Sequence, residues 1–157
     1  MKHSKKAFIK KVVLFALSGS MILFIWYNSL QPPDASAQAS GAVSDAIRSV
    51  FDALHIPLSP DAFILVYLRK IAHFLEYAVL GTLLSFLVIC NYRVRLQNII
   101  NILFVGVLTA VCDETIQIYT GRGSVLTDVW IDISGVFAAV FLIFLFHRLF
   151  ATRRRRA

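Results

Sequence analysis

Four apolar segments, each close to 20 residues long, most constrain how this chain of 157 residues can fold. They run from about Val12 to Leu30, from Ile71 to Cys90, from Ile99 to Tyr119 and from Val125 to Leu145. A helix needs about 20 apolar residues to cross the hydrocarbon core of a bilayer. The composition agrees, because 58% of the residues are hydrophobic and only 16% are charged. We therefore predict an all-α integral membrane bundle of four transmembrane helices.

The positively charged residues are distributed asymmetrically around these segments. Of 16 Lys and Arg residues, five lie in the N-terminal tail, two between the second and third segments, and five at the C-terminal end. The positive-inside rule predicts that both termini are cytoplasmic in a bacterial cell membrane. All nine acidic residues then lie on the external side or in the half of the membrane nearest to it. Nucleic-acid binding is disfavoured, because it requires a basic soluble face.

A single membrane domain is expected over residues 12–150, between basic tails at residues 1–11 and 151–157. The first apolar segment also has features of a secretory signal peptide, with Ala35-Ser36-Ala37 as a cleavage site. Its length and the distance to that site favour an anchor helix instead. Cys90 and Cys112 are expected at opposite depths, so we predict no disulfide and interpret both as small buried hydrophobic residues.

The sizeable extramembrane segment is a loop over about residues 31–64. Gln31-Pro32-Pro33 ends the first helix, since proline cannot continue one, and the small polar residues 34–41 predict a loop. Apolar residues from Val43 to Leu54 recur at helical spacing and predict a short amphipathic extracytoplasmic helix. This helix lies on the outer leaflet, covers the bundle or packs against the other helices. Ser59-Pro60-Asp61 is an N-terminal helix signal, so the second spanning helix is expected to begin near Pro60.

Polar residues interrupt three of the four apolar segments, always toward the external end. They are His73 and Glu76 in the second segment, Asp113, Glu114 and Gln117 in the third, and Asp128 and Asp132 in the fourth. With a rise of about 1.5 Å per residue, the three groups reach the same outer third of the bilayer. Ionisable residues within a span are costly and usually face the bundle interior or a watery cavity. A polar pocket open to the outside is therefore predicted.

Helical spacing extends this pocket. Residues that share a helix face are Lys70 and Tyr77 with His73, Gln117 with Asp113, and Asp132 with Asp128. Arg122 lies between Gly121 and Gly123 in a short outer loop, where a tight glycine turn can aim it back over the pocket. Gly81 and Gly106 permit close contacts between helices.

Several chemical roles are open to these residues. The candidate acid and base residues of a catalytic site are His73, Glu76, Asp113 and Glu114. The candidate binding residues are Lys70, Tyr77, Gln117, Arg122, Asp128 and Asp132. Among the cations, Arg69, Lys70 and Arg122 suit a phosphate, pyrophosphate or carboxylate headgroup. Alternatively, the carboxylates pair with the basic residues and simply join the helices.

Metal binding is the less favoured role. A histidine with several carboxylates provides suitable ligand types, but the set contains only one membrane-embedded histidine. It also contains no compact ligand motif such as H-E-x-x-H. The sequence therefore assigns no metal ligand, and it does not identify a cofactor.

Four blocks of this sequence resemble the VanZ-like family of small bacterial membrane proteins. The blocks are Asn28–Pro32, Arg69–Gly81, Asp113–Gln117 with Gly121-Arg122, and Asp128–Gly135. The resemblance covers nearly the whole chain and is specific in the order and spacing of the blocks. The family's namesake is associated with resistance to glycopeptide antibiotics, teicoplanin more than vancomycin, so the resemblance implies a role at the cell envelope.

The favoured hypothesis is that the external pocket engages a lipid-linked cell-wall intermediate, an anionic lipid or the lipoglycopeptide antibiotic itself. If the protein is an enzyme, Glu76 or Asp113 is the expected base, His73 an acid or base, and Arg122 with Lys70 the anion clamp. The alternative is a non-enzymatic small transporter, sensor or assembly partner. Transport by a monomer is disfavoured, because the acids cluster at one level and the inner half of each segment is apolar.

Overall fold

The computed structural model describes residues 2–53, 55, 61–91, 94–122 and 126–154. These residues form the helices α1 (Lys2–Leu30), α2 (Pro33–Ala53), α3 (Asp61–Asn91), α4 (Leu96–Tyr119) and α5 (Leu126–Arg154). Every helix except α2 is long and apolar enough to cross a membrane, over Lys5–Leu30, Tyr67–Asn91, Leu96–Tyr119 and Leu126–Leu149. The predicted all-α bundle with four spanning helices is confirmed, and the described part of the chain contains no strand.

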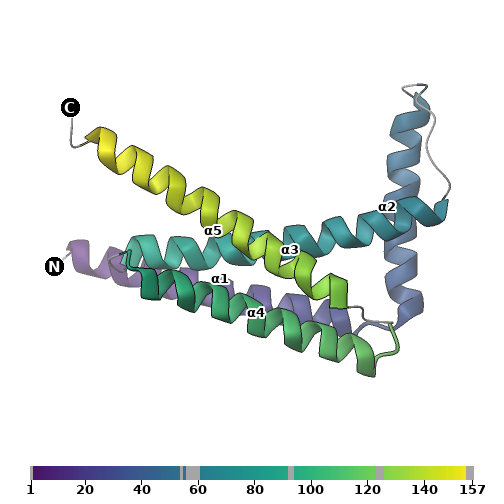
Figure 1. Ribbon diagram of the computed structural model, residues 1–157, viewed down its shortest axis with the longest axis horizontal. Coiled ribbons are helices and arrows are strands. Elements are labelled where there is room, and N and C mark those ends of the chain that lie inside the picture. The colour runs from purple at the N-terminus through teal and green to yellow at the C-terminus, as the bar shows by residue number, and fades with distance from the viewer. Residues whose placement is uncertain (1, 54, 56–60, 92–93, 123–125, 155–157) are drawn as a thin grey trace.

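The four spanning helices run alongside one another, and both termini lie at the same end of the bundle (Figure 1). At the opposite end, α2 runs across the bundle axis and packs against α3 (Figure 1). The basic residues of the predicted N-terminal tail continue α1 as helix rather than preceding it. Cys90 and Cys112 are both free and half-buried.

The surface of the bundle is apolar in a way that suits lipid. Phe15, Phe104 and Trp130 are exposed over 70%, 65% and 66% of their surface. In water such large exposed apolar areas would promote association. The buried core is small by comparison and includes Ile25, Leu80 and Val136. The lateral surface of the bundle is therefore a surface for contact with acyl chains.

The predicted loop over residues 34–41 is wrong, because α2 begins at Pro33 and continues without a break to Ala53. Proline is tolerated at the first helical position, where its missing N–H costs no hydrogen bond. Asp34 lies in the first turn, where a negative charge interacts favourably with the helix dipole. The alanines that follow have the highest helix propensity. The predicted amphipathic helix is thus the second half of α2; Leu54, Ser59 and Pro60 lie outside the described residues.

Glycine residues allow α3 and α5 to form the most extensive helix contact in the bundle. A Cβ atom at Gly135 would lie 2.3 Å from the Phe74 carbonyl oxygen, and one at Gly81 would lie 2.9 Å from the Val136 carbonyl oxygen. On α4, Gly106 accommodates the Val136 side chain, whose methyl groups would lie 2.9 Å from an added Cβ. Close backbone approach of this kind favours helix association in lipid. The predicted roles of Gly81 and Gly106 are confirmed.

Candidate functional site

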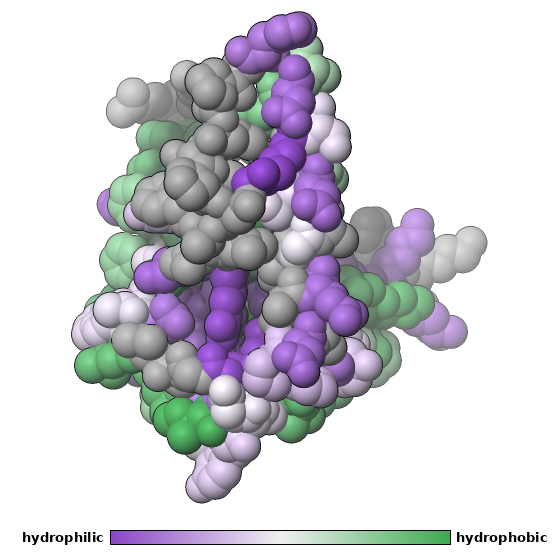
Figure 2. Space-filling model, turned by 90° about the vertical axis from the view of Figure 1, so that its right-hand side faces the viewer, coloured by the Kyte–Doolittle hydropathy of each residue, from purple (hydrophilic) through white to green (hydrophobic). Residues whose placement is uncertain are grey.

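The polar residues of α3, α4 and α5 converge at the end of the bundle where α2 lies. Figure 2 looks onto this end and shows hydrophilic side chains gathered in a hollow, with apolar side chains on its flanks. The same end carries the first turns of α3 and α5 and the last turns of α4 (Figure 1). The arrangement of the helices therefore brings the three polar groups to one level of the bundle, as the helical rise predicted.

The inner part of the site is almost completely closed to solvent. Asp113, Gln117 and Asp132 are 0% exposed, and Glu114 is 4% exposed. Gln117 Nε2 donates hydrogen bonds to Asp113 Oδ2 at 3.3 Å and to Glu114 Oε1 at 3.2 Å. These three residues share one face of α4 because they are three and four residues apart. A set of carboxylates buried in this way requires compensating partners, since isolated buried charge is strongly unfavourable.

Two of those partners come from α1 and were not identified by helical spacing. The Ser29 hydroxyl, which is 1% exposed, donates a hydrogen bond to Asp113 Oδ1. Asn28 Nδ2 donates to Glu76 Oε1 at 3.0 Å. Both residues belong to the block Asn28–Pro32, which carries the family resemblance. This block is the feature of the sequence that indicated a contribution of α1 to the site.

His73 lies between carboxylates from two other helices. Its Nδ1 atom is 3.3 Å from Asp132 Oδ1 on α5 and 3.7 Å from Asp113 Oδ2 on α4. The His73 side chain is 12% exposed, so it lies at the boundary between the closed inner part and the opening. Neither contact has the geometry of a hydrogen bond, and both Asp132 oxygens are buried without a hydrogen-bond partner.

Tyr77 lies one turn further along α3 than His73 and forms part of the floor of the site. Its side chain is 0% exposed, and its hydroxyl group makes no hydrogen bond. A buried polar group without a partner costs about 1–3 kcal/mol. The inner part of the site therefore contains unsatisfied polar atoms on α3 and on α5.

Three half-buried basic side chains surround the opening. Arg69 Nη2 donates to Gln117 Oε1 at 2.6 Å, and the buried Nε atom of Arg69 has no hydrogen-bond partner. Lys70 Nζ lies 4.0 Å from Asp128 Oδ1, and its side chain is 40% exposed. Arg122 Nη1 donates to the carbonyl oxygen of Asn28 at 2.6 Å. The site thus combines a buried acidic interior with a basic rim.

The position of Arg122 follows from the way α4 ends. Gly121 has a φ angle of +72°, a left-handed conformation in which glycine carries no steric penalty. The Gly121 N–H bonds to the Ile118 carbonyl at 3.2 Å, and the Arg122 N–H bonds to the Gln117 carbonyl at 3.0 Å. This pair of hydrogen bonds is the Schellman pattern of helix C-termini. The glycine turn therefore directs Arg122 toward α1; Gly123 lies outside the described residues.

Arg122 also experiences the charges of the site. Burial and the positive charge of Arg69 lower the pKa of the Arg122 guanidinium, whereas Asp113, Glu114 and Glu76 act in the opposite direction. An arginine remains protonated at neutral pH even so. Arg122 thus contributes a permanent positive charge at the edge of the acidic interior.

The ten predicted site residues all lie at this end, but they form distinct groups. The tightest group consists of His73, Asp113, Glu114 and Asp132, whose potential ligand atoms all lie within 4.8 Å of one another. Glu76 lies toward α1 through its bond with Asn28, and Lys70 pairs with Asp128 at the margin. Gln117 links the acidic group to Arg69.

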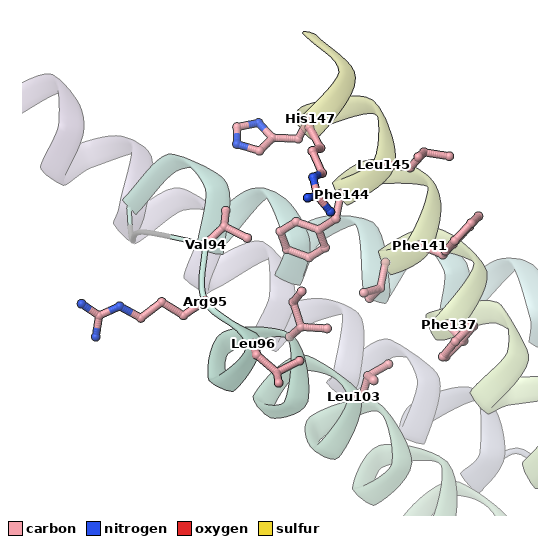
Figure 3. Close-up of a pocket in the computed structure, with 12 residues that line it drawn as sticks. Val94, Arg95, Leu96, Leu103, Phe137, Phe141, Phe144, Leu145 and His147 are labelled. Carbon is pink, nitrogen blue, oxygen red and sulfur yellow. The ribbon is translucent and has the colours of Figure 1, made fainter. Parts of the chain in front are cut away.

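A groove of about 670 Å³ lies at the other end of the bundle, between the start of α4 and the last turns of α5 (Figure 3). Most of its lining is aliphatic or aromatic, including Leu96, Leu103 and Phe144, and its ionisable residues are Arg95, His147 and Arg148. Such a lining suits acyl chains rather than acid–base chemistry. The ionisable cluster at the α2 end therefore remains the candidate functional site.

The fold and the site define a multi-pass membrane protein with a buried ionisable cluster near one membrane face. The chain belongs to the VanZ/LLP1 family, whose family model matches residues 13–147. The match includes most of each spanning helix and every residue of the candidate site, which confirms the resemblance seen in the four sequence blocks. No significant match was found among curated proteins or among solved structures.

Proposed function

We propose that this VanZ/LLP1-family protein acts at the external face of the bacterial cell membrane by binding the anionic headgroup of a lipid. The proposal rests on one observation above all: a buried guanidinium N–H, Nε of Arg69, has no hydrogen-bond partner at the rim of the site. A phosphate oxygen is a suitable acceptor, since guanidinium–phosphate hydrogen bonds are strong and directional. The expected ligand is a phosphate-bearing lipid, such as a lipid-linked cell-wall intermediate.

The other basic residues of the rim support the same ligand. The Lys70 side chain is 40% exposed, and its 4.0 Å contact with Asp128 is a weak ion pair. Lys70 therefore loses little free energy when it replaces this contact with one to a phosphate. Arg122 donates to the Asn28 carbonyl and adds a permanent positive charge at the same edge of the site. Binding the headgroup at the rim places it directly above the buried carboxylates.

The acid and base residues assigned from the sequence lie within this arrangement. His73 contacts Asp132 and Asp113, and carboxylates adjacent to an imidazole orient it for proton transfer. In this proposal His73 exchanges protons with the headgroup, with Glu76 or Asp113 as the base. Glu114, Tyr77 and Gln117 complete the interior that supports these groups.

The binding step is tested by calorimetry with purified protein in neutral detergent and short-chain phosphatidic acid as the probe. Arg69→Gln and Lys70→Gln should each weaken binding at least about 10-fold, because a hydrogen bond to a charged group contributes about 1.5–3 kcal/mol. Arg48→Gln on α2 removes an arginine at the same end of the protein, outside the site, and serves as the control. Equal weakening in all three variants, or no binding by the wild type, would contradict the proposal.

A second experiment, in a Gram-positive host, measures tolerance of the cells to teicoplanin and vancomycin. Wild type, Glu76→Gln and Asp113→Asn are compared at equal membrane levels, with Asp45→Asn on the exposed face of α2 as the matched control. Tolerance to teicoplanin conferred by wild type and Asp45→Asn alone supports action at the envelope through the site. Identical behaviour of all variants would exclude a role of the site in resistance.

A second candidate function, a non-enzymatic sensor, transporter or assembly partner, is favoured by a different observation. The site residues join three helices through the bonds Ser29–Asp113, Asn28–Glu76 and Arg122–Asn28. In that case the buried charges are structural, and Asp113→Asn reduces the membrane level of the protein as much as its function. Proton flux into liposomes that depends on Glu76 or Asp113 would identify a transporter.

A further inference from the structure

We infer that His73, Asp113, Glu114 and Asp132 together bind one divalent transition-metal ion of the Zn²⁺ or Mn²⁺ class. Each residue offers one ligand atom, and the four atoms all lie within 4.8 Å of one another. They come from α3, α4 and α5, so only the assembled bundle brings them together. This inference shares His73 and Asp113 with the proposed proton exchange, but none of the three rim cations proposed to bind the headgroup takes part in it.

Two of the separations already fit a metal centre. Metal bonds to histidine nitrogen and carboxylate oxygen are about 2.0–2.2 Å long, so ligand atoms of one tetrahedral centre lie roughly 3.3–3.6 Å apart. His73 Nδ1 is already 3.3 Å from Asp132 Oδ1 and 3.7 Å from Asp113 Oδ2. The remaining pairs of ligand atoms lie within 4.8 Å of one another, so binding would draw them closer together. Neither His73 contact is a hydrogen bond, so a metal displaces no hydrogen bond from His73 Nδ1.

An independent observation comes from Asp132. This residue is 0% exposed, and neither of its carboxylate oxygens accepts a hydrogen bond. Its Oδ1 atom is aimed at His73 Nδ1. A fully buried carboxylate without hydrogen bonds is among the least favourable arrangements in a protein, and coordination of a metal is one of the few ways to satisfy it. The site therefore has an open acceptor where the cation would bind.

The balance of charge also favours a cation. The site residues include five carboxylates, on Glu76, Asp113, Glu114, Asp128 and Asp132, and three permanent cations, on Arg69, Lys70 and Arg122. Arg69 bonds Gln117, and Lys70 pairs with Asp128. With a neutral His73, a divalent ion would bring the formal charge of this group to zero. Such compensation matters more inside a membrane span than in water.

The donor set selects the class of metal. Carboxylate oxygens alone suit Mg²⁺, Ca²⁺ and Mn²⁺, whereas an imidazole nitrogen shifts the preference toward Zn²⁺ and other transition metals. One nitrogen and three oxygens therefore favour Zn²⁺ or Mn²⁺ over Mg²⁺ and Ca²⁺. The Tyr77 hydroxyl, buried one turn after His73 and without a hydrogen-bond partner, is available to support a coordinating ligand. This assignment goes beyond the sequence expectation, which counted a single histidine and no ligand motif.

The test uses the purified full chain in detergent, stripped with a chelator and titrated with Zn²⁺, Mn²⁺, Mg²⁺ and Ca²⁺ without added lipid. One equivalent of Zn²⁺ or Mn²⁺ should bind, and it should raise the thermal unfolding temperature. Co²⁺ used as a spectroscopic substitute should show visible absorption bands that change in His73→Gln. Asp132→Asn and Glu114→Gln keep the side-chain shape and should weaken binding at least about 100-fold, since loss of a ligand's supporting partner alone costs about 10- to 100-fold.

Asp45→Asn is the control, because it removes an acid on the exposed face of α2, outside the ligand group. It should retain wild-type stoichiometry and the metal-dependent rise in unfolding temperature. Binding that is equal in wild type, Asp132→Asn and Asp45→Asn would overturn the assignment, as would a wild type that binds none of the four ions. If a variant fails to fold, the Co²⁺ spectrum of the wild type still tests the site: intense bands of a four-coordinate centre support it, and the weak bands of aqueous Co²⁺ would overturn it.

Discussion

Ser29 shows how one small side chain at the residue scale connects a helix to the site. Its hydroxyl is the donor by which α1 reaches Asp113, and Thr120 Oγ1 bonds the Ser29 carbonyl at 3.2 Å. A third contact comes from Gln117 Nε2, which lies 3.4 Å from Ser29 Oγ. Residues in the last turns of α4 and just after it therefore contact both the hydroxyl and the carbonyl of Ser29. The position of the Asp113 carboxylate depends on α1 as well as on α4.

Ser29→Ala should therefore lower the free energy of unfolding by about 1–2 kcal/mol, because it leaves Asp113 Oδ1 without its α1 donor in a closed interior. Ser18→Ala is the matched control. Ser18 is also buried on α1, but its hydroxyl bonds only the Leu14 carbonyl of its own helix at 2.9 Å. Unfolding of both variants by denaturing detergent gives the comparison. Equal losses would show that the Ser29–Asp113 bond has no particular stabilising role.

At the scale of elements, the contact between α3 and α5 sets the geometry of the site. Gly135 allows α5 to approach the Phe74 carbonyl, and Phe74 is the neighbour of His73 in the chain. Asp132 lies three residues before Gly135 on α5, so the same approach brings Asp132 toward His73. Packing of two apolar helix faces through a glycine therefore determines the distance between two site residues.

Gly135→Ala should be strongly destabilising, since its Cβ would lie 2.3 Å from a backbone oxygen that cannot rotate away. Overpacking in a core costs about 1–3 kcal/mol or more, and we expect the upper part of that range. Gly19→Ala on α1 is the control, because nothing lies within 4 Å of its added Cβ and alanine has the higher helix propensity. Thermal unfolding in detergent measures both. If Gly135→Ala left the unfolding temperature unchanged, α3 and α5 could move apart without loss of stability.

The elements also show what a sequence can and cannot predict. The four spans follow from hydropathy because every residue of a span faces lipid or a neighbouring helix. The common depth of His73, Asp113 and Asp132 follows from the fixed helical rise. Residues 34–41 were misassigned because small polar residues are compatible with both a loop and a helix start. The contributions of Asn28 and Ser29 depend on contacts between helices, which the spacing within one helix does not describe.

At the scale of the whole molecule, charge is separated along the bundle axis. The five lysines of the α1 start and the arginines of the α5 end lie at the end that holds both termini, and the acidic site lies at the other (Figure 1). The four spanning helices return the chain to the side where it began. The positive-inside rule predicts that the basic end lies inside the cell, which would make α2 and the site face outward. The headgroup proposal depends on this orientation, because it places the ligand in the outer leaflet.

Single cysteines at the two ends test the orientation in intact cells, in a background where Cys90 and Cys112 are replaced by alanine. Ser49→Cys lies on the exposed face of α2, and Gln97→Cys lies exposed at the start of α4. A membrane-impermeant maleimide should label the first in intact cells and the second only after permeabilisation. Labelling of both after permeabilisation controls for the reactivity of each thiol. The reverse pattern would place the site at the cytoplasmic face, where the rim cations would meet the anionic lipids of the inner leaflet and an externally applied glycopeptide could not reach them.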